Sequence, residues 1–269
     1  MEHSLKLTSV GNARDLGGYA AGGKTIREGR LLRAASVAGL SEEDRHTLET
    51  VYRVAAVVDL RMSTERRLAP DPEISGAASL FLPVMEMEDY SGYDPKLAKM
   101  LLEPGANRLE LMKNAYEMGM LDEGLYTGFL FSDRGKAAYR GLFDCLLTLP
   151  EGRACLWHCT DGKDRTGVAA MLVLTALGAD RETVMHDYLL TNEFNAPRLA
   201  AVRAGLARAA LTPELRELAL FGSGAVYEAY MTNALRAMDA RCGSSEGYLA
   251  RELGVGPAEC AALRRKFLR

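Results

Sequence analysis

The chain has 269 residues, of which 48% are hydrophobic and 26% are charged, so it can bury a sizeable core in one large or two small domains. The formal net charge of −3 excludes the strongly basic surface that is typical of a nucleic-acid-binding protein. The cysteines have no regular spacing, and we expect them to be reduced thiols: Cys145, Cys155, Cys159, Cys242 and Cys260.

The N-terminal sequence MEHSLKLTSV lacks the basic start and apolar stretch of a signal peptide. No apolar run approaches the ~18 residues that would span a membrane. We therefore expect a cytoplasmic protein with no stable membrane insertion and no nucleic-acid partner. Export by a route without a cleaved signal stays open.

The first half of the chain favours strands alternating with helices. A short strand is expected at 30–34, and a helix at 41–51, where a serine is followed by three acids in the first turn. The β-branched run at 54–61 predicts a strand buried on both faces, and 78–85 is a third strand candidate. Residues 86–127 are weakly periodic, which suggests loops and short helices, and one interpretation is an insertion near the site.

The second half continues this alternation and then becomes helical. We expect a helix at 134–149, a strand at 153–159 and a buried helix at 166–178. This order predicts an α/β fold with a mainly parallel central sheet flanked by helices. Residues 1–269 are interpreted as a single domain. Its helical C-terminal part, 197–269, either packs on the domain or forms a mobile lid.

The segment CLWHCTDGKDRTGVAAML, residues 155–172, places a cysteine between a strand and a helix. Helix N-termini and nearby cations stabilise a thiolate, which is the nucleophilic form. The amides of 160–165 can turn inward as an anion nest, and Gly162 permits the tight turn. Arg165 supplies a planar fork that matches two phosphate oxygens. The pattern predicts a loop that holds a phosphate dianion over the Cys159 thiolate for displacement at phosphorus.

The stretch HCTDGKDRTG at 158–167 resembles the signature loop of the cysteine-based protein tyrosine phosphatase superfamily. It is similar to the bacterial tyrosine and dual-specificity branch, some members of which act on phosphoinositides. The segment GNARDLGGY at 11–19 resembles the N-terminal motif of that branch. The segments GRLLRAASVAGLSEED, VVDLRMSTER and HDYLLTNEFN follow in the order of the family. The resemblance covers residues 11 to about 196 and implies a phosphatase fold, a phospho-cysteine intermediate and no metal or other cofactor.

The resemblance also implies a role for the main residues of the loop. Cys159 is the expected nucleophile, Arg165 clamps the phosphate, and Thr166 donates its hydroxyl to the sulfur. His158 is expected behind the nucleophile, where it helps to fix the loop. Lys163 is expected at the pocket rim, where it could meet further phosphates. The residues expected to bind phosphate are Thr160, Asp161, Gly162, Lys163, Asp164 and Arg165.

Other polar residues are expected to support the loop. Asp161 stands where the branch often has a small residue, so its charge should weaken anion binding and disfavour highly charged lipid headgroups. Arg14 and Asp15, in a glycine-rich turn, either brace the phosphate loop or serve the turn itself. Asp59 and Arg61 follow a buried strand and are expected to support the loop from its carboxyl end.

The leaving oxygen needs a proton, so a carboxylic acid must lie near the loop. Many relatives carry this acid in a Trp-Pro-Asp motif, but the only tryptophan here, Trp157, lies in a predicted strand. Asp164 is the first candidate for the general acid, and Asp59 is an alternative. Further candidates from less regular stretches are Asp89, Asp94 and Asp133.

The sequence thus predicts a metal-independent phosphomonoesterase. Phosphotyrosine is the default substrate, and phosphoserine, phosphothreonine and phosphoinositides are alternatives. Rhodanese-like sulfur transfer is a rival, although such domains usually lack the fixed Arg165–Thr166 pair. A phosphate-recognition module without turnover is a second rival, although a pure binder has no need of the Cys159 thiolate.

Overall fold

A five-stranded sheet, with the strand order β1-β4-β7-β5-β6, forms the centre of the molecule. The computed structural model describes residues 3–89, 113, 116, 123–207 and 209–269. The sheet strands are β1 (Arg14–Asp15), β4 (Leu31–Ala34), β5 (Val54–Asp59), β6 (Ala78–Phe81) and β7 (Ala154–His158). The strands β4, β7, β5 and β6 run parallel, and β1 is antiparallel to β4. The short strands β2 (Ala20–Ala21) and β3 (Lys24–Thr25) pair separately.

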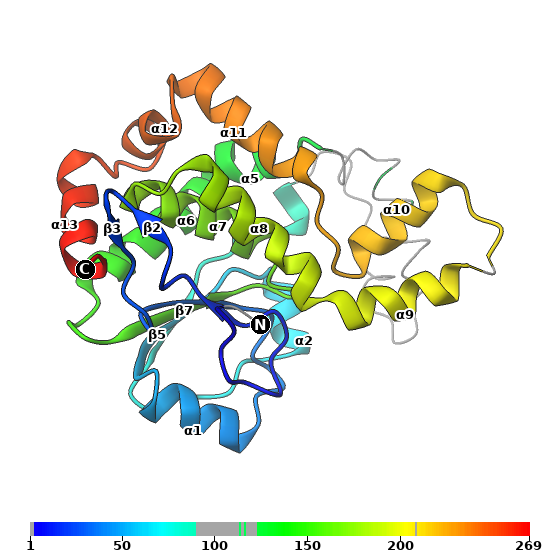
Figure 1. The fold of residues 1–269 in the computed structure, drawn as a ribbon, viewed down its shortest axis with the longest axis horizontal. Coiled ribbons are helices and arrows are strands. Elements are labelled where there is room, and N and C mark those ends of the chain that lie inside the picture. Colours follow the sequence, from blue (N-terminus) through cyan, green and yellow to red (C-terminus); the bar gives the residue numbers. More distant parts are fainter. Residues whose placement is uncertain (1–2, 90–112, 114–115, 117–122, 208) are drawn as a thin grey trace.

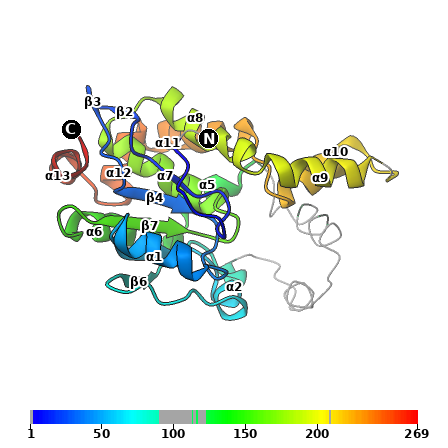
Figure 2. The same cartoon turned by 60° about the horizontal axis from the view of Figure 1, so that its bottom comes forward.

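Helices cover both faces of this sheet (Figures 1 and 2). In the first half of the described chain they are α1 (Glu42–Thr50), α2 (Ser63–Leu68) and the 3-10 helix η1 (Met87–Asp89). The central and following helices are α5 (Leu125–Phe131), α6 (Asp133–Thr148), α7 (Asp164–Leu177), α8 (Arg181–Phe194), α9 (Ala196–Leu206), α10 (Pro213–Gly222), α11 (Glu228–Cys242), α12 (Ser245–Glu252) and α13 (Pro257–Phe267). The α9–α10 pair projects away from the body of the molecule (Figure 1).

Strand β7 separates two apolar cores because its side chains alternate between the two faces of the sheet. Cys155 and Trp157 belong to the larger core, which is shared with α6, α7 and α11. Leu156 belongs to the smaller core, which is shared with Leu48 of α1. All five residues of β7 are buried. The strand predicted at 153–159 is therefore confirmed, and both of its faces are buried.

The parallel register aligns the carboxyl ends of the three central strands. His158, the last residue of β7, pairs with Ala34 of β4 on one side and with Asp59 of β5 on the other. In parallel α/β sheets, ligands bind beyond this edge. The chain leaves β7 at this edge and turns directly into α7, which is buried along almost its whole length and ends at Gly178 in a left-handed conformation (φ 88°).

The predicted α/β architecture is confirmed, and the differences are local. The strand expected at 78–85 ends at Phe81, shortly before Pro83, which has no amide hydrogen for a strand ladder. Of the region 86–127, residues 90–112, 114–115 and 117–122 lie outside the described part, so the predicted insertion stays a prediction, as do the single domain and the lid. Among the described helices, none has the length and apolar character needed to cross a membrane.

Candidate active site

The loop from His158 to Asp164 joins β7 to α7 at the carboxyl edge of the sheet. Cys159 directly follows the strand and is only 2% exposed. The loop then passes into the first turn of α7, where amide hydrogens without helical partners provide positive potential. The structure therefore places Cys159 directly before the loop that leads into the N-terminus of a buried helix.

Gly162 fixes the shape of this loop. Its φ is 66°, in the left-handed region, and a Cβ atom at this position would lie 2.5 Å from the carbonyl carbon and oxygen of Ala34. No larger residue fits without moving β4. The Gly162 carbonyl accepts hydrogen bonds from Asn12 Nδ2 and from Arg33 Nη2, both at 2.9 Å. The N-terminal segment and β4 together hold the turn.

Two buried arginines share one buried carboxylate beneath this turn. Arg14 Nε lies 3.0 Å from Asp187 Oδ1, and Arg33 Nη1 pairs with the other oxygen of the same carboxylate. Burial and the Arg14 charge lower the pKa of Arg33 to about 10, against the opposing effect of Asp187. Burial would raise the pKa of Asp187, but the two arginines lower it. Two cations and one anion leave a net positive charge under the phosphate loop.

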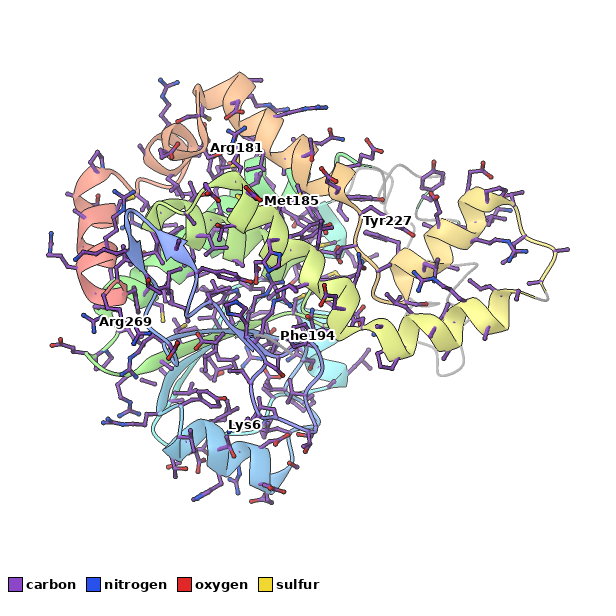
Figure 3. The ribbon with its side chains drawn as sticks, in the orientation of Figure 1. Lys6, Arg181, Met185, Phe194, Tyr227 and Arg269 are labelled. Carbon is purple, nitrogen blue, oxygen red and sulfur yellow. The ribbon has the colours of Figure 1, made fainter. Side chains whose placement is uncertain are left out.

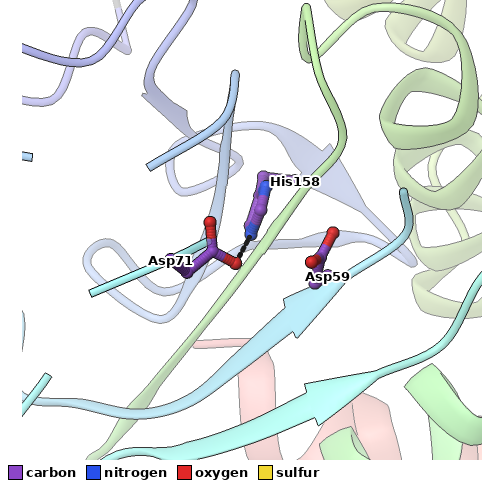
Figure 4. Close-up of side chains that lie close together, drawn as sticks. All are labelled: Asp59, Asp71 and His158. Atoms are coloured by element: carbon purple, nitrogen blue, oxygen red, sulfur yellow. Dashed lines mark hydrogen bonds and ion pairs between the residues drawn. The ribbon is translucent and has the colours of Figure 1, made fainter. Parts of the chain in front are cut away.

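A second buried network lies behind the cysteine (Figure 4). His158 Nε2 lies 3.0 Å from Asp71 Oδ2, and its Nδ1 lies 3.2 Å from the Cys159 carbonyl oxygen. Arg61 pairs with Asp59 through Nε at 2.8 Å and with Asp71 through Nη2 at 2.8 Å. The three groups His158, Asp59 and Asp71 lie close enough together to ligate a metal, but Arg61 already donates hydrogen bonds to both carboxylates. The arrangement orients the histidine and the strand end behind the thiol.

This network also reaches the outer part of the loop. Arg61 Nη1 donates to Ser36 Oγ at 3.0 Å, and the Ser36 amide donates to the Thr160 carbonyl at 3.0 Å. Burial would raise the pKa of Asp59, but the Arg61 hydrogen bonds and the nearby His158 lower it. Asp59 and Arg61 therefore lie where the sequence predicts supporting residues.

Arg165 is gripped by Glu65 of α2. Its Nη1 and Nη2 lie 2.5 and 2.9 Å from the two carboxylate oxygens, and the Thr160 hydroxyl donates to the same carboxylate. The Met62 amide donates to Glu65 Oε2 at 2.8 Å. Burial alone would raise the pKa of Glu65, but the Arg165 charge and these hydrogen bonds lower it to about 2. Glu65 is therefore ionised at neutral pH, and this carboxylate holds the Arg165 guanidinium in place.

Lys163 does not stand at an exposed rim, which corrects the expectation from the sequence. It is only 3% exposed, and its Nζ lies 3.3 Å from the centre of the Phe221 ring. Nζ also lies 3.2 Å from Asp164 and 3.4 Å from the Ala225 carbonyl. A cation–π contact and an adjacent carboxylate stabilise this buried ammonium group. The C-terminal helices therefore cover the lysine.

Asp164 lies at the start of a chain of hydroxyl groups. Tyr126 OH donates to Asp164 Oδ1 at 2.7 Å and lies 3.0 Å from Tyr188 OH. Tyr188 OH lies 3.3 Å from the carbonyl of Tyr227, just before α11 (Figure 3). Burial and the Asp164 charge raise the pKa of Tyr126 well above its ordinary value. Tyr126 is therefore a neutral hydrogen-bonding group beside the carboxylate.

The remaining predicted residues have different positions. Asp161 Oδ1 forms an ion pair with Arg198 Nη1 of α9 at 2.9 Å. The Thr166 hydroxyl is buried and has no hydrogen-bond partner among the described residues, so the expected bond to the Cys159 sulfur is not formed. Asp15 accepts hydrogen bonds from the amides of Gly17 and Gly29, so it serves its own turn and does not brace the loop.

The alternative proton donors are engaged elsewhere in the structure. Asp89 pairs with Arg134, with Oδ2 2.6 Å from Nε, and Asp133 is fully exposed beside Lys136. Asp94 lies outside the described residues. The loop itself contains two carboxylates, Asp161 and Asp164. Asp161 is paired with Arg198, whereas no described arginine pairs with Asp164, so Asp164 stays the first candidate.

Several residues of this site were missed by the sequence reasoning: Arg33, Glu65, Asp71, Tyr126 and Asp187. Arg33, Glu65 and Asp187 lie within the segments GRLLRAAS, VVDLRMSTER and HDYLLTNEFN, whose order already resembles the family. An ionisable residue inside an otherwise apolar strand, such as Arg33 in β4, is a signal for a buried partner. Asp71 and Tyr126 had no comparable signal.

Comparison with known proteins agrees with this geometry. A model described as the tyrosine phosphatase family matches residues 5–269. The chain belongs to the tyrosine phosphatase family. It is 32% identical to a protein of Cupriavidus necator whose name assigns it provisionally to the tyrosine-protein phosphatases, over 99% of this chain and 89% of that protein. It is 30% identical to the triple specificity protein phosphatase PtpB of Mycobacterium tuberculosis, over 98% of both chains.

A more distant member of the family is a tyrosine-protein phosphatase of Nostoc commune. It is 25% identical over 87% of this chain and 72% of that protein. Because the family model spans nearly the whole chain, the C-terminal helices belong to the family region too, beyond the residue 196 at which the sequence resemblance ended. The family is one of phosphatases, and it implies phosphoprotein substrates.

Proposed function

We propose that the protein hydrolyses phosphotyrosine through a phospho-cysteine intermediate at Cys159. The observation that carries this proposal is the loop between β7 and α7, which places a buried cysteine just before a buried helix whose first turn contains Arg165. In the first step, Sγ attacks phosphorus and the bond from phosphorus to the phenolic oxygen breaks. The loop amides and Arg165 stabilise the equatorial oxygens.

The hold of Glu65 leaves Arg165 available for phosphate. Glu65 occupies the end of the guanidinium, at Nη1 and Nη2, and no described residue accepts from Nε. The Nε–H and the adjacent outer N–H therefore form a free edge of the fork. A planar fork fixed on one side presents two parallel donors on the other, which suits two phosphate oxygens.

Asp164 is the proposed proton donor to the leaving phenolic oxygen. The chain Asp164–Tyr126–Tyr188 has two consistent hydrogen arrangements. With Asp164 ionised, Tyr126 donates to it. With Asp164 protonated, Asp164 donates to Tyr126, Tyr126 donates to Tyr188, and Tyr188 donates to the Tyr227 carbonyl. In the second step, water attacks phosphorus, the S–P bond breaks, and Asp164 takes the proton from that water.

Phosphotyrosine is favoured over phosphoinositides by the charges around the loop. Lys163, the cation that could meet additional phosphates, is buried against Phe221 and Asp164. Asp161 holds Arg198, and Asp164 holds Lys163, so these two cations beside the loop already have partners. A headgroup with several phosphates would have to displace these carboxylates. Because the relative PtpB is named a triple specificity phosphatase, the alternatives suggested by the sequence, phosphoserine, phosphothreonine and phosphoinositides, should be compared with phosphotyrosine as substrates.

The test is hydrolysis of an aryl phosphate in the presence of a metal chelator. Wild type should be active, Cys159→Ser should lose activity completely, and Cys260→Ser, a buried cysteine whose thiol contacts the Val255 carbonyl, should retain it. Asp164→Asn should lose much more activity on poor leaving groups than on good ones. Full activity in Cys159→Ser would refute the mechanism. Phosphate-ester binding without turnover in wild type would favour the recognition module.

A further inference from the structure

An ion pair links the middle of the phosphate loop to α9. Asp161 lies two residues after Cys159, and its Oδ1 is 2.9 Å from Arg198 Nη1. The side chains are 18% and 42% exposed, so the pair stands at the surface end of the loop. The two residues are separated by 37 positions in the chain. Because α9 projects from the body of the molecule (Figure 1), this pair joins the loop to that projecting segment.

The charge of Asp161 opposes the binding task of the loop. Two residues of chain span at most about 7 Å, so Asp161 lies within the ~8 Å over which charges interact at physiological salt. A carboxylate at this distance repels a phosphate dianion. Arg198 supplies the opposite charge at hydrogen-bond distance, which neutralises that repulsion.

The surroundings hold both partners in place. Asn12 Nδ2 donates to the Asp161 carbonyl at 3.3 Å, so the backbone is fixed while the carboxylate faces α9. On the other side, Asn195 Nδ2 donates to the Gly224 carbonyl at 2.9 Å. Gly224 has a φ of 109°, and a Cβ there would lie 2.9 Å from Asn195 Nδ2. The glycine between α10 and α11 therefore leaves room for the Asn195 side chain at the start of α9.

The other charged residues that face the loop already have partners. Arg165 pairs with Glu65, and Lys163 pairs with Asp164. Beneath the loop, Arg33 pairs with Asp187. Loss of Arg198 would therefore remove the arginine that pairs with Asp161, while these other pairs stay in place.

We propose that Arg198 is a positioning residue of the phosphatase, which sustains the affinity of the loop for phosphate esters by neutralising Asp161. The inference rests on the proposed function of the same loop. The Asp161 charge acts on the bound phosphate before and during the reaction alike. Loss of Arg198, which leaves the Asp161 charge without this counter-ion, should therefore raise KM and leave kcat nearly unchanged.

A double-mutant cycle tests this coupling. KM and kcat for an aryl phosphate, and the inhibition constant of inorganic phosphate, are measured for wild type, Arg198→Gln, Asp161→Asn and the double variant. Arg198→Gln should raise KM and the inhibition constant about three- to fivefold, the size expected for a partly exposed ion pair. Asp161→Asn should lower both. In the Asp161→Asn background, Arg198→Gln should not raise either constant.

Two controls separate this effect from a general loss of positive charge. Arg203→Gln removes an exposed arginine from the same helix and should change neither constant. The effect of Arg198→Gln should shrink at 0.5 M salt, because the Asp161 charge acts through partly solvated space.

The inference is overturned by an equal rise in KM in both backgrounds, which would mean that Arg198 contacts the substrate itself. It is also overturned if Arg198→Gln changes nothing. Calorimetric titration of inorganic phosphate into the Cys159→Ser forms of the four proteins gives the same cycle without turnover. Failure of the thiolate mechanism would therefore appear in the activity of Cys159→Ser, and failure of the Arg198 inference in the phosphate affinities.

Discussion

Glu65 binds the Arg165 guanidinium through both carboxylate oxygens, at 2.5 and 2.9 Å, and the two residues come from α2 and α7. Glu65 is itself held by the Met62 amide, through the capping arrangement at the start of α2. The orientation of the arginine is therefore determined before any substrate arrives. Preorganised groups stabilise a transition state without reorganisation at the moment of reaction.

Replacing Glu65 should reduce catalysis. Glu65→Gln keeps the shape of the side chain but removes its charge and one of its two acceptors, so Arg165 should sample other rotamers. We expect kcat/KM for an aryl phosphate to fall at least about tenfold, since displacing a transition-state donor is costly. Steady-state kinetics check this, with the exposed Glu73→Gln as the matched control. Unchanged kcat and KM in Glu65→Gln would show that the ion pair between Glu65 and Arg165 is not needed for catalysis.

The same carboxylate predicts a window of acid sensitivity. Its pKa falls from 4.5 to about 2 on folding, so the folded state favours the ionised form. The resulting stability, about 3 kcal/mol at most, is fully present above pH 4.5 and is lost as the pH falls toward 2. Urea unfolding at a series of pH values should show that Glu65→Gln lacks this part of the acid-induced loss. Parallel curves for the two proteins would contradict the assignment.

Removing the charge of Asp187 should lower the free energy of unfolding of the protein. Asp187→Asn leaves Arg14 and Arg33 buried without a counter-ion, which we expect to cost about 3–5 kcal/mol. Chemical denaturation measures this cost. The matched control is Asp239→Asn, which breaks an exposed pair with Arg181 and should cost about 1 kcal/mol or less. Similar denaturation midpoints for both variants would mean that the buried ion pairs stabilise the protein no more than the exposed pair does.

A methyl group at position 162 should disable the loop. In Gly162→Ala the new Cβ would lie 2.5 Å from the backbone of Ala34, at a φ of 66° that alanine avoids. Phosphate affinity and kcat/KM should both collapse, by about a hundredfold or more, because a 1 Å displacement can cost that much. Gly39→Ala meets no atom within 4 Å and should behave as wild type. An active Gly162→Ala protein would show that the loop tolerates another shape.

The hydroxyl of Tyr126 should matter for proton delivery. Tyr126→Phe removes the donor to Asp164 while preserving the ring contacts with Phe129 and Tyr230. We expect about a tenfold loss of kcat on an alkyl-type leaving group and little loss on a nitrophenyl one, since only the former needs the acid. The exposed-site control is Tyr52→Phe, whose hydroxyl meets only the Lys6 amide among the described residues. Equal losses on both leaving groups would refute the role.

The sheet and the loop were predictable because their signals are local. The runs at 54–58 and 154–157 are apolar without interruption, as is typical of strands buried on both faces. The positions of Cys159, Gly162 and Arg165 follow from a strand, a tight turn and a helix in sequence. Short pairings such as β1, with only two residues, leave no periodic pattern and were missed.

The partners of the loop residues were not predictable, because they come from distant parts of the chain. Glu65 meets Arg165 across 100 positions, and Asp71 meets His158 across 87. The expectation for Lys163 was wrong because Phe221, in the C-terminal helices, covers it. A single sequence contains no signal for such pairs, since side-chain complementarity has neither a period nor a fixed spacing.

The pairing of Arg14 with Asp187 has a consequence for how the enzyme is made. The two residues are 173 positions apart, and Arg33 depends on the same carboxylate. A ribosome adds roughly 5–20 residues each second, so both arginines wait on the order of ten seconds or more for their counter-ion. During synthesis Cys159 is made before Asp187, so the buried ion pairs beneath its loop cannot yet form. Catalytic competence should therefore arise only after α8 has emerged and its buried carboxylate has joined the two arginines.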